Sequence, residues 1–176
     1  MSWVHIAIPA ALICLAASVL SANKHCIAMI PWKDLLKDLD KLNRIISPHC
    51  IFDYDKNHLC DPETMVKMVK HDTVLITEIM NKTAWIYGKK EHPFPYDSAM
   101  KFINGVVNAR TKLNPCGNHP SRISHDPVTK CFNKMDTFLT MKASSIANSR
   151  CAWEIVHATT REMLQRLERC SLGGRR

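Results

Sequence analysis

The chain has 176 residues, eight cysteines and a formal net charge of +8. That length is enough for one domain with a substantial core. The basic pairs Lys89-Lys90 and Arg175-Arg176 are short and few aromatic residues are interleaved with them, so nucleic-acid binding is not indicated. The positive charge is compatible with acidic glycans or an acidic partner surface, and equally with an ordinary solvated basic surface.

Residues 1–22 contain no Lys, Arg, Asp or Glu. Their apolar run, from Ile6 to Leu20, is too short to span a bilayer comfortably, and the small residues Ser21 and Ala22 follow it. This pattern predicts a secretory signal peptide that is cleaved near Ala22, and the alternative is a buried N-terminal helix. No later segment is apolar enough to cross a membrane. We therefore expect residues 23–176 to form a soluble, secreted protein without membrane insertion.

Secretion makes disulfides the default interpretation of the cysteines. Cys14 leaves with the signal peptide, and seven remain: Cys26, Cys50, Cys60, Cys116, Cys131, Cys151 and Cys170. Because seven is odd, at least one thiol stays free or pairs with another molecule. The chain has no CxxC pair, no HExxH motif and no Cys/His cluster at zinc spacing, so we expect no metal site and no cofactor.

Hydrophobic periodicity predicts the first of five helices directly after Pro31. Apolar residues recur on one helical stripe over 32–46, and Ser47-Pro48 ends the pattern. No comparable pattern indicates strands.

The second helix has a strong start signal in Asp61-Pro62-Glu63. It is predicted to continue to about Tyr87. Asp72 falls on the apolar face of this helix, so we expect it to have a polar partner. Asn81-Lys82-Thr83, on the same helix, is the only glycosylation sequon. Asn81 lies away from the core, so we predict an exposed side chain that can carry a glycan in a eukaryotic host; the alternative is an unused sequon.

The third helix is predicted over about 96–113 and the fourth over about 126–141, where Asp126-Pro127 repeats the start signal of the second. The fifth covers CAWEIVHATTREMLQRLERC, residues 151–170. At 100° per residue its apolar half holds Ala152, Trp153, Ile155, Val156, Met163, Leu164 and Leu167. The other half holds Glu154, His157, Ala158, Arg161, Glu162, Gln165, Glu168 and Arg169. This is an amphipathic helix with a continuous polar face, and Trp153 is predicted to be core. Five helices with medium connections predict a helical bundle.

The run CAWEIV, followed by an amphipathic helix, resembles the last helix of type I interferons, whose pattern there is Cys-Ala-Trp-Glu-Val/Ile-Val. The similarity is close over 151–158 and weaker over 126–150, and helix order agrees from Trp32 onward. The cysteine set is most similar to the four-cysteine type I interferons of fish. The resemblance implies an all-α fold over 23–176: a five-helix up-up-down-down cytokine bundle with long loop connections and disulfides.

Two disulfides are implied by the resemblance, Cys26–Cys116 and Cys50–Cys151. The helix directions of such a bundle agree with both, since each pair falls at one end of it. A third pair, Cys60–Cys170, is our own inference, because Cys60 precedes helix two and Cys170 ends helix five, both at one end. Helix five is about 28 Å long at 1.5 Å per residue, so Cys170 cannot reach the other end. Cys131 would then be a free thiol that behaves as a small hydrophobe. The alternative is a frayed tail with both thiols free.

The resemblance implies a secreted cytokine that binds a two-chain class II cytokine receptor, made of the type I interferon receptor chains, and triggers JAK-STAT antiviral signalling. The family's high-affinity receptor chain contacts the outer face of helix five and the loop after helix one. The matching positions on helix five are His157, Ala158, Arg161, Glu162 and Gln165, and the loop candidates are Tyr54, Asp55 and Lys56. For each residue the alternative is an ordinary solvated face.

Two other functional classes stay open: a different secreted helical cytokine, or a cationic membrane-active host-defence protein. An enzyme is disfavoured. His71-Asp72 is similar to the His-Asp pair of secreted phospholipases A2, but that pair needs a Gly-rich calcium loop, and this chain has five glycines in all.

Overall fold

The computed structural model describes residues 23–42, 50, 59–69, 72–89, 92–116, 126–143 and 146–172. Within these ranges the chain is helical, without a strand, which confirms the all-α prediction. The labelled helices are α2 (Trp32–Asp40), α4 (Pro62–Val69), α5 (Thr73–Tyr87), α6 (Tyr96–Leu113), α7 (Asp126–Lys142) and α8 (Ile146–Leu172), with a short 3-10 turn, η2 (Asn114–Cys116), after α6. Residues 23–28 form a further short helix before α2. The predicted signal peptide, 1–22, lies outside the described residues.

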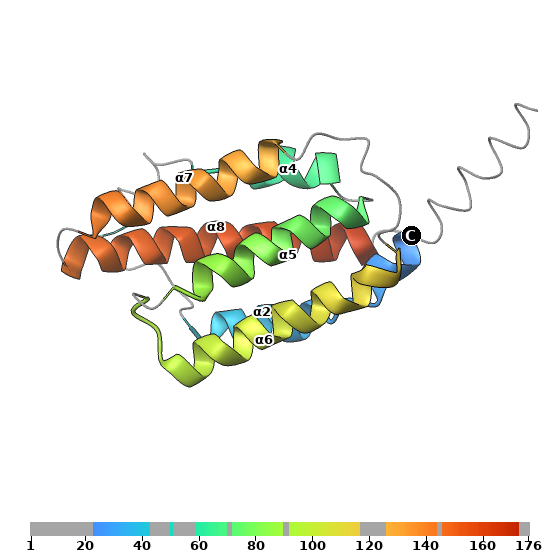
Figure 1. The fold of residues 1–176 in the computed structure, drawn as a ribbon, viewed down its shortest axis with the longest axis horizontal. Helices are drawn as coiled ribbons and strands as arrows, with labels where there is room; N and C mark the ends of the chain where they lie inside the picture. The colour runs from blue at the N-terminus through green and yellow to red at the C-terminus, as the bar shows by residue number, and fades with distance from the viewer. Residues whose placement is uncertain are drawn as a thin grey trace, which may run out of the picture.

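The long helices lie roughly side by side along one axis, as Figure 1 shows. α2, α5 and α7 run in one direction, and α6 and α8 run in the other. α8 occupies the middle of the bundle and packs against α2, α4 and α7, while α5 packs against α6 and α7. This arrangement gives α8 neighbours on several sides, which limits the part of its surface that reaches solvent.

The predicted second helix is two helices. α4 ends at Val69 and α5 begins at Thr73. Asp72, expected to sit on an apolar face with a polar partner, is the N-cap of α5: its carboxylate accepts hydrogen bonds from the backbone amides of Val74 and Leu75, both at 3.0 Å. An N-cap residue has non-helical dihedral angles, so a helix begins at Asp72 and a continuous one cannot pass through it.

Helix starts and ends differ from the prediction elsewhere as well. α2 ends at Asp40, and residues 43–49 lie outside the described part of the chain. α8 begins at Ile146, so Cys151 lies in its second turn instead of opening it.

Aromatic side chains form the centre of the core. Tyr87 lies edge-on to Phe102 and to Trp153, with ring centroids 5.1 and 5.8 Å apart. Phe94, in the segment that leads into α6, packs on Trp153 at 5.6 Å. Trp153 is 3% exposed, so its predicted place in the core is confirmed.

Three disulfides cross-link the described residues. Cys26–Cys116 and Cys50–Cys151, the two pairs that the resemblance implies, are present, with Cα atoms 6.4 and 5.2 Å apart. The third joins Cys60 to Cys131, with Cα atoms 5.1 Å apart, and Cys170 is free. The prediction of Cys60–Cys170 and a free Cys131 is therefore wrong. It assumed that Cys60 begins one long second helix at the end of the bundle. Because α4 is a separate short helix that packs against α8, Cys60, directly before it, lies beside Cys131 of α7 instead.

Candidate functional site

The solvent-facing strip of α8 holds four of the residues that the interferon resemblance predicts as a receptor site. Ala158, Arg161, Glu162 and Gln165 are all partly exposed there. The strip is narrow, because α2 and α4 pack against the same helix. Each neighbour contributes a carboxylate that binds an arginine of α8. The strip is therefore a composite surface of three helices.

Arg161 is held by α2. Its Nε donates to Oδ1 of Asp40 at 2.5 Å and its Nη2 donates to Oδ2 at 3.3 Å. Such two-point binding orients the planar guanidinium. The hydrogen bond that Arg161 donates to Asp40 raises the pKa of Arg161, so the guanidinium stays positively charged. Sequence reasoning did not select Asp40; the only signal was a carboxylate near the end of helix one.

Arg166 joins the strip to α4. It donates to Oε1 of Glu162 at 2.8 Å from Nη2, and its Nη1 lies 3.5 Å from Oε2 of Glu63. Glu63 also accepts from Lys67, and these cations, Lys67 first, lower its pKa. Neither Glu63 nor Arg166 was a sequence candidate. The pairing follows from the separate position of α4, which periodicity did not indicate.

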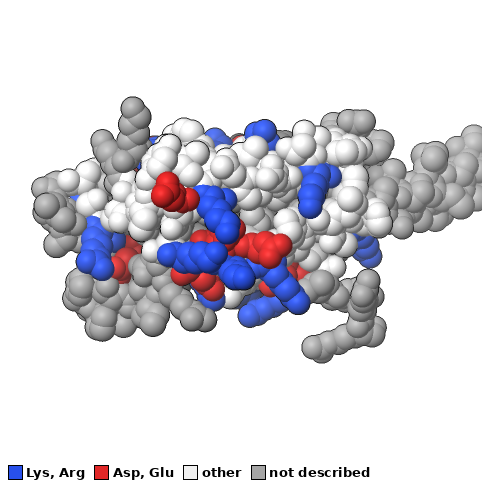
Figure 2. All heavy atoms as spheres, turned by 90° about the horizontal axis from the view of Figure 1, so that it is seen from below, with Lys and Arg blue, Asp and Glu red and all other residues white. Residues whose placement is uncertain are grey.

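An open groove of about 440 Å³ adjoins this strip between α2 and the end of α8. It is lined by Lys33, Leu36, Lys37, Asp40, Lys41 and Glu168. Lys41 binds Asp38 at 3.1 Å, and Lys101 of α6 approaches the same carboxylate at 3.4 Å. Figure 2 shows acidic and basic side chains intermixed on this lower side of the molecule, without a large area of one sign.

His157 does not belong to this surface, which corrects the prediction. It is 4% exposed, and its ring centroid lies 5.8 Å from that of Phe94. Its Nδ1 is 3.4 Å from the hydroxyl of Tyr87. Glu154, also expected on the polar half, is 3% exposed and bonded to Arg150 at 3.3 Å. The helical wheel correctly ordered these residues around α8, but Phe94, just before α6, packs on His157 at the edge of the polar half.

The remaining sequence candidates have separate outcomes. Tyr54, Asp55 and Lys56 lie outside the described residues. Asn81 is exposed on α5, away from the α8 strip. The described part of the chain has no group of three or more His, Cys, Asp or Glu side chains that could hold a metal ion. None of its helices is long and apolar enough to cross a membrane.

No protein-family model, curated protein or solved structure matches the chain.

Proposed function

We propose that the chain is a secreted, type I interferon-like cytokine. It binds a two-chain class II cytokine receptor on the cell surface and triggers JAK-STAT antiviral signalling. It acts as a ligand, without catalysis and without a cofactor. The three disulfides support passage through an oxidising compartment, where such bonds persist.

The observation that carries the proposal is the pair of disulfides at the two ends of the bundle. Cys26–Cys116 and Cys50–Cys151 each join segments about a hundred residues apart, at separations of 90 and 101. These are the two pairs that the interferon resemblance implies. The helix directions add support, since α2 and α5 run one way while α6 and α8 run the other, as in an up-up-down-down bundle.

The receptor site of this proposal is the strip of Ala158, Arg161, Glu162 and Gln165, extended by Asp40 of α2 and Arg166. His157 is removed from the site because it is buried. Arginine is enriched among residues that dominate binding energy at interfaces. Arg161 enters binding already oriented by Asp40, which reduces the entropy lost when a partner immobilises it. Tyr54, Asp55 and Lys56 remain loop candidates of the proposal.

The deciding experiment treats fish cells with the secreted protein and measures STAT phosphorylation and antiviral transcripts. Titration against the type I interferon receptor ectodomains then tests the site. Arg161→Ala should weaken binding by more than about 1 kcal/mol. Lys134→Ala, which removes an equal charge from an exposed position on α7, is the matched control and should leave binding unchanged. Silent cells together with leakage of anionic vesicles would reject the cytokine and favour a membrane-active protein.

A further inference from the structure

Gly105, in the middle of α6, lies against α2. A Cβ atom at this position would be 3.1 Å from Cδ2 of Leu35, a buried residue of α2. This separation is shorter than an ordinary van der Waals contact, so any larger residue would press on α2. Phe102 and Val106, on the same helix, are also buried. The packing of α2 on α6 therefore favours glycine at position 105, although glycine weakens a helix interior.

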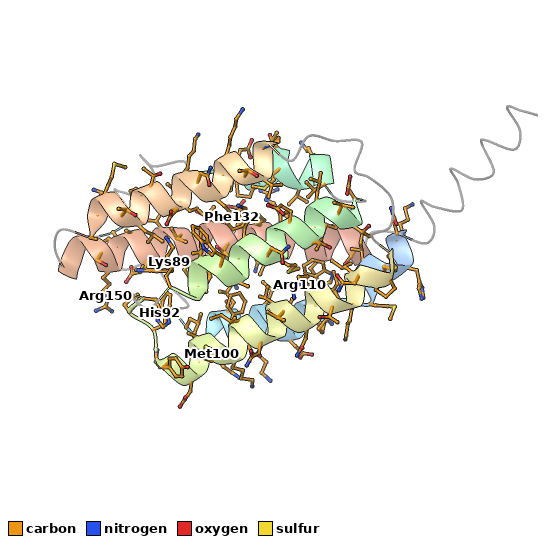
Figure 3. The ribbon with its side chains drawn as sticks, viewed as in Figure 1. Lys89, His92, Met100, Arg110, Phe132 and Arg150 are labelled. Atoms are coloured by element: carbon orange, nitrogen blue, oxygen red, sulfur yellow. A yellow bond between two sulfur atoms is a disulfide. The ribbon has the colours of Figure 1, made fainter. Side chains whose placement is uncertain are left out.

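The residue before Gly105 is Asn104, whose side chain is exposed. It is the one asparagine in the sequence that a glycine follows. Asparagine is a thermolabile residue, because the backbone nitrogen of the next residue can attack its side-chain amide carbon. Glycine has no Cβ to shield that nitrogen. The helix packing thus creates a labile dipeptide on the stretch of α6 between Met100 and Arg110, which are labelled in Figure 3.

α6 itself prevents this attack in the folded protein. The helix extends over Tyr96–Leu113, so the Gly105 amide lies within it and donates to the carbonyl of Lys101, four residues earlier. The nitrogen must lose its proton before it can attack, and this hydrogen bond holds the proton in place. Helical dihedral angles also keep the side chain of Asn104 away from the nitrogen that follows it. The reaction therefore requires α6 to open around Gly105.

We propose that Asn104 is a site of self-modification that becomes reactive when α6 opens. The Gly105 nitrogen gives its proton to hydroxide and bonds to Cγ of Asn104. The Cγ–Nδ2 bond breaks, and the amide nitrogen takes up a proton and leaves as ammonia. Water then opens the five-membered ring at one of its two carbonyl carbons. Opening at Cγ gives aspartate, and opening at the main-chain carbonyl carbon gives isoaspartate. No oxidant or reductant takes part.

Isoaspartate carries the main chain through the former side chain, and so it adds one methylene to the backbone of α6. The hydrogen bonds from amide to carbonyl then lose their spacing of four residues across position 104. Phe102 and Val106, which lie on either side of that position, no longer share their places in the core. Aspartate leaves the backbone unchanged and lies at an exposed position. Opening of α6 therefore alters a part of the molecules irreversibly, which limits how long the folded protein persists.

Trypsin releases the reactive asparagine and an internal control in one peptide, FINGVVNAR, residues 102–110. The control is Asn108, which is exposed on the same helix and is followed by Ala109. The chain is kept in mildly alkaline urea, and mass spectrometry of this peptide follows the deamidation of each asparagine. Asn104 should convert about tenfold faster than Asn108, because glycine leaves the attacking nitrogen accessible. Gly105→Ala should remove the difference. Equal rates in the natural chain would overturn the proposed reactivity.

The same measurement without urea tests whether the fold controls the reaction. Conversion of Asn104 should be at least about tenfold slower than in urea, because the reaction waits for α6 to open. Leu35→Ala, which removes the α2 side chain packed on Gly105, should raise the rate in buffer about threefold or more. Trp85→Ala, at an exposed position of α5, is the matched control and should leave the rate unchanged. A rate in buffer equal to that in urea, or no response to Leu35→Ala, would overturn control by the fold.

Refolding separates the two products. After incubation in urea with its disulfides intact, the protein is diluted into buffer and digested briefly with thermolysin, which removes chains that do not refold. The surviving protein should be depleted about twofold or more in isoaspartate relative to aspartate at position 104, because protease cuts the open form. Equal proportions before and after digestion would overturn the predicted damage to α6. The inference does not rest on the proposed receptor, so failed receptor binding would reject the proposed function alone.

Discussion

Arg161 of α8 and Asp40 of α2, which are 121 residues apart in the sequence, form a two-point ion pair between the two helices. The Arg161 side chain remains 34% exposed, so solvent screens the pair. The contact fixes the end of α2 against the middle of α8. It therefore orients the candidate surface more than it stabilises the fold.

A double-mutant cycle separates these two effects. Arg161→Ala, Asp40→Ala and the double variant should give a coupling energy of about 0.5–1 kcal/mol in urea unfolding, as is usual for exposed pairs. Receptor affinity should fall in Asp40→Ala as well as in Arg161→Ala, because the guanidinium is no longer held in place. A coupling above about 3 kcal/mol would show instead that the pair behaves as a buried one.

The buried Trp153 and the exposed Trp85 should respond very differently to truncation. Trp153→Ala should cost about 3–5 kcal/mol of unfolding free energy, because the ring fills the aromatic core. Trp85→Ala, the matched substitution at an exposed site, should stay within about 0.5 kcal/mol of the natural chain. Chemical denaturation of both aglycosylated variants measures the difference, and similar losses would contradict the assigned core.

His157→Ala should lower the unfolding free energy by more than about 1 kcal/mol, because it leaves a cavity beside Phe94 and Tyr87. A solvated histidine would give a change within about 0.5 kcal/mol. The matched control is Gln165→Ala, which lies on the partly exposed strip of the same helix. Thermal unfolding of the natural chain and the two variants decides whether His157, at the edge of the polar half of α8, is buried.

The disulfide pairing predicts one reactive thiol in the mature protein. Iodoacetamide under non-reducing conditions should label Cys170 and spare the six paired cysteines. Removing the third bond with Cys60→Ala and Cys131→Ala should cost about 2–5 kcal/mol. Cys170→Ala should change stability by less than about 0.5 kcal/mol. Peptide mapping that recovers a 60–170 cross-link would contradict this pairing.

Tyr87 should make the protein sensitive to alkaline pH. Burial favours the neutral phenol and raises the pKa of Tyr87 above its ordinary value of 10.0. Above that pH the unfolded chain releases this proton while the folded chain keeps it, so stability is full below about pH 10 and falls as the pH rises. Urea unfolding at several pH values measures how steeply the unfolding free energy falls with pH. Tyr87→Phe keeps the ring and should make the unfolding free energy depend less on pH. An unchanged dependence would assign the alkaline sensitivity to other groups.

Periodicity was sufficient for the helical class and for most of the core, because the apolar stripes of 32–40 and 151–170 follow a single period of 3.6 residues. It failed at Asp72. A carboxylate on an apolar face has the same position on a helical wheel whether it is buried with a partner or caps a new helix. The two amide donors that distinguish these cases become visible only in the folded backbone.

The candidate site shows a second feature that the sequence alone could not predict, namely which helices lie beside α8. Arg161 and Glu162 were candidates because they match the receptor-contacting positions that the interferon resemblance implies, and they lie on the polar half of one helix. Their partners Asp40 and Glu63 come from helices whose position beside α8 the sequence did not determine. His157 was misassigned for a related reason. A single helix shows which residues share a face, but it does not show which loop returns to cover that face.

The order of the disulfides along the chain has a consequence for a protein exposed to proteases. Cys26–Cys116 interleaves with both other bonds, while Cys60–Cys131 is nested within Cys50–Cys151. Every peptide bond between residues 26 and 151 is therefore spanned by at least one disulfide. A single cut in any loop of that region leaves both fragments covalently joined, so a nicked molecule keeps its mass on a non-reducing gel and separates only after reduction.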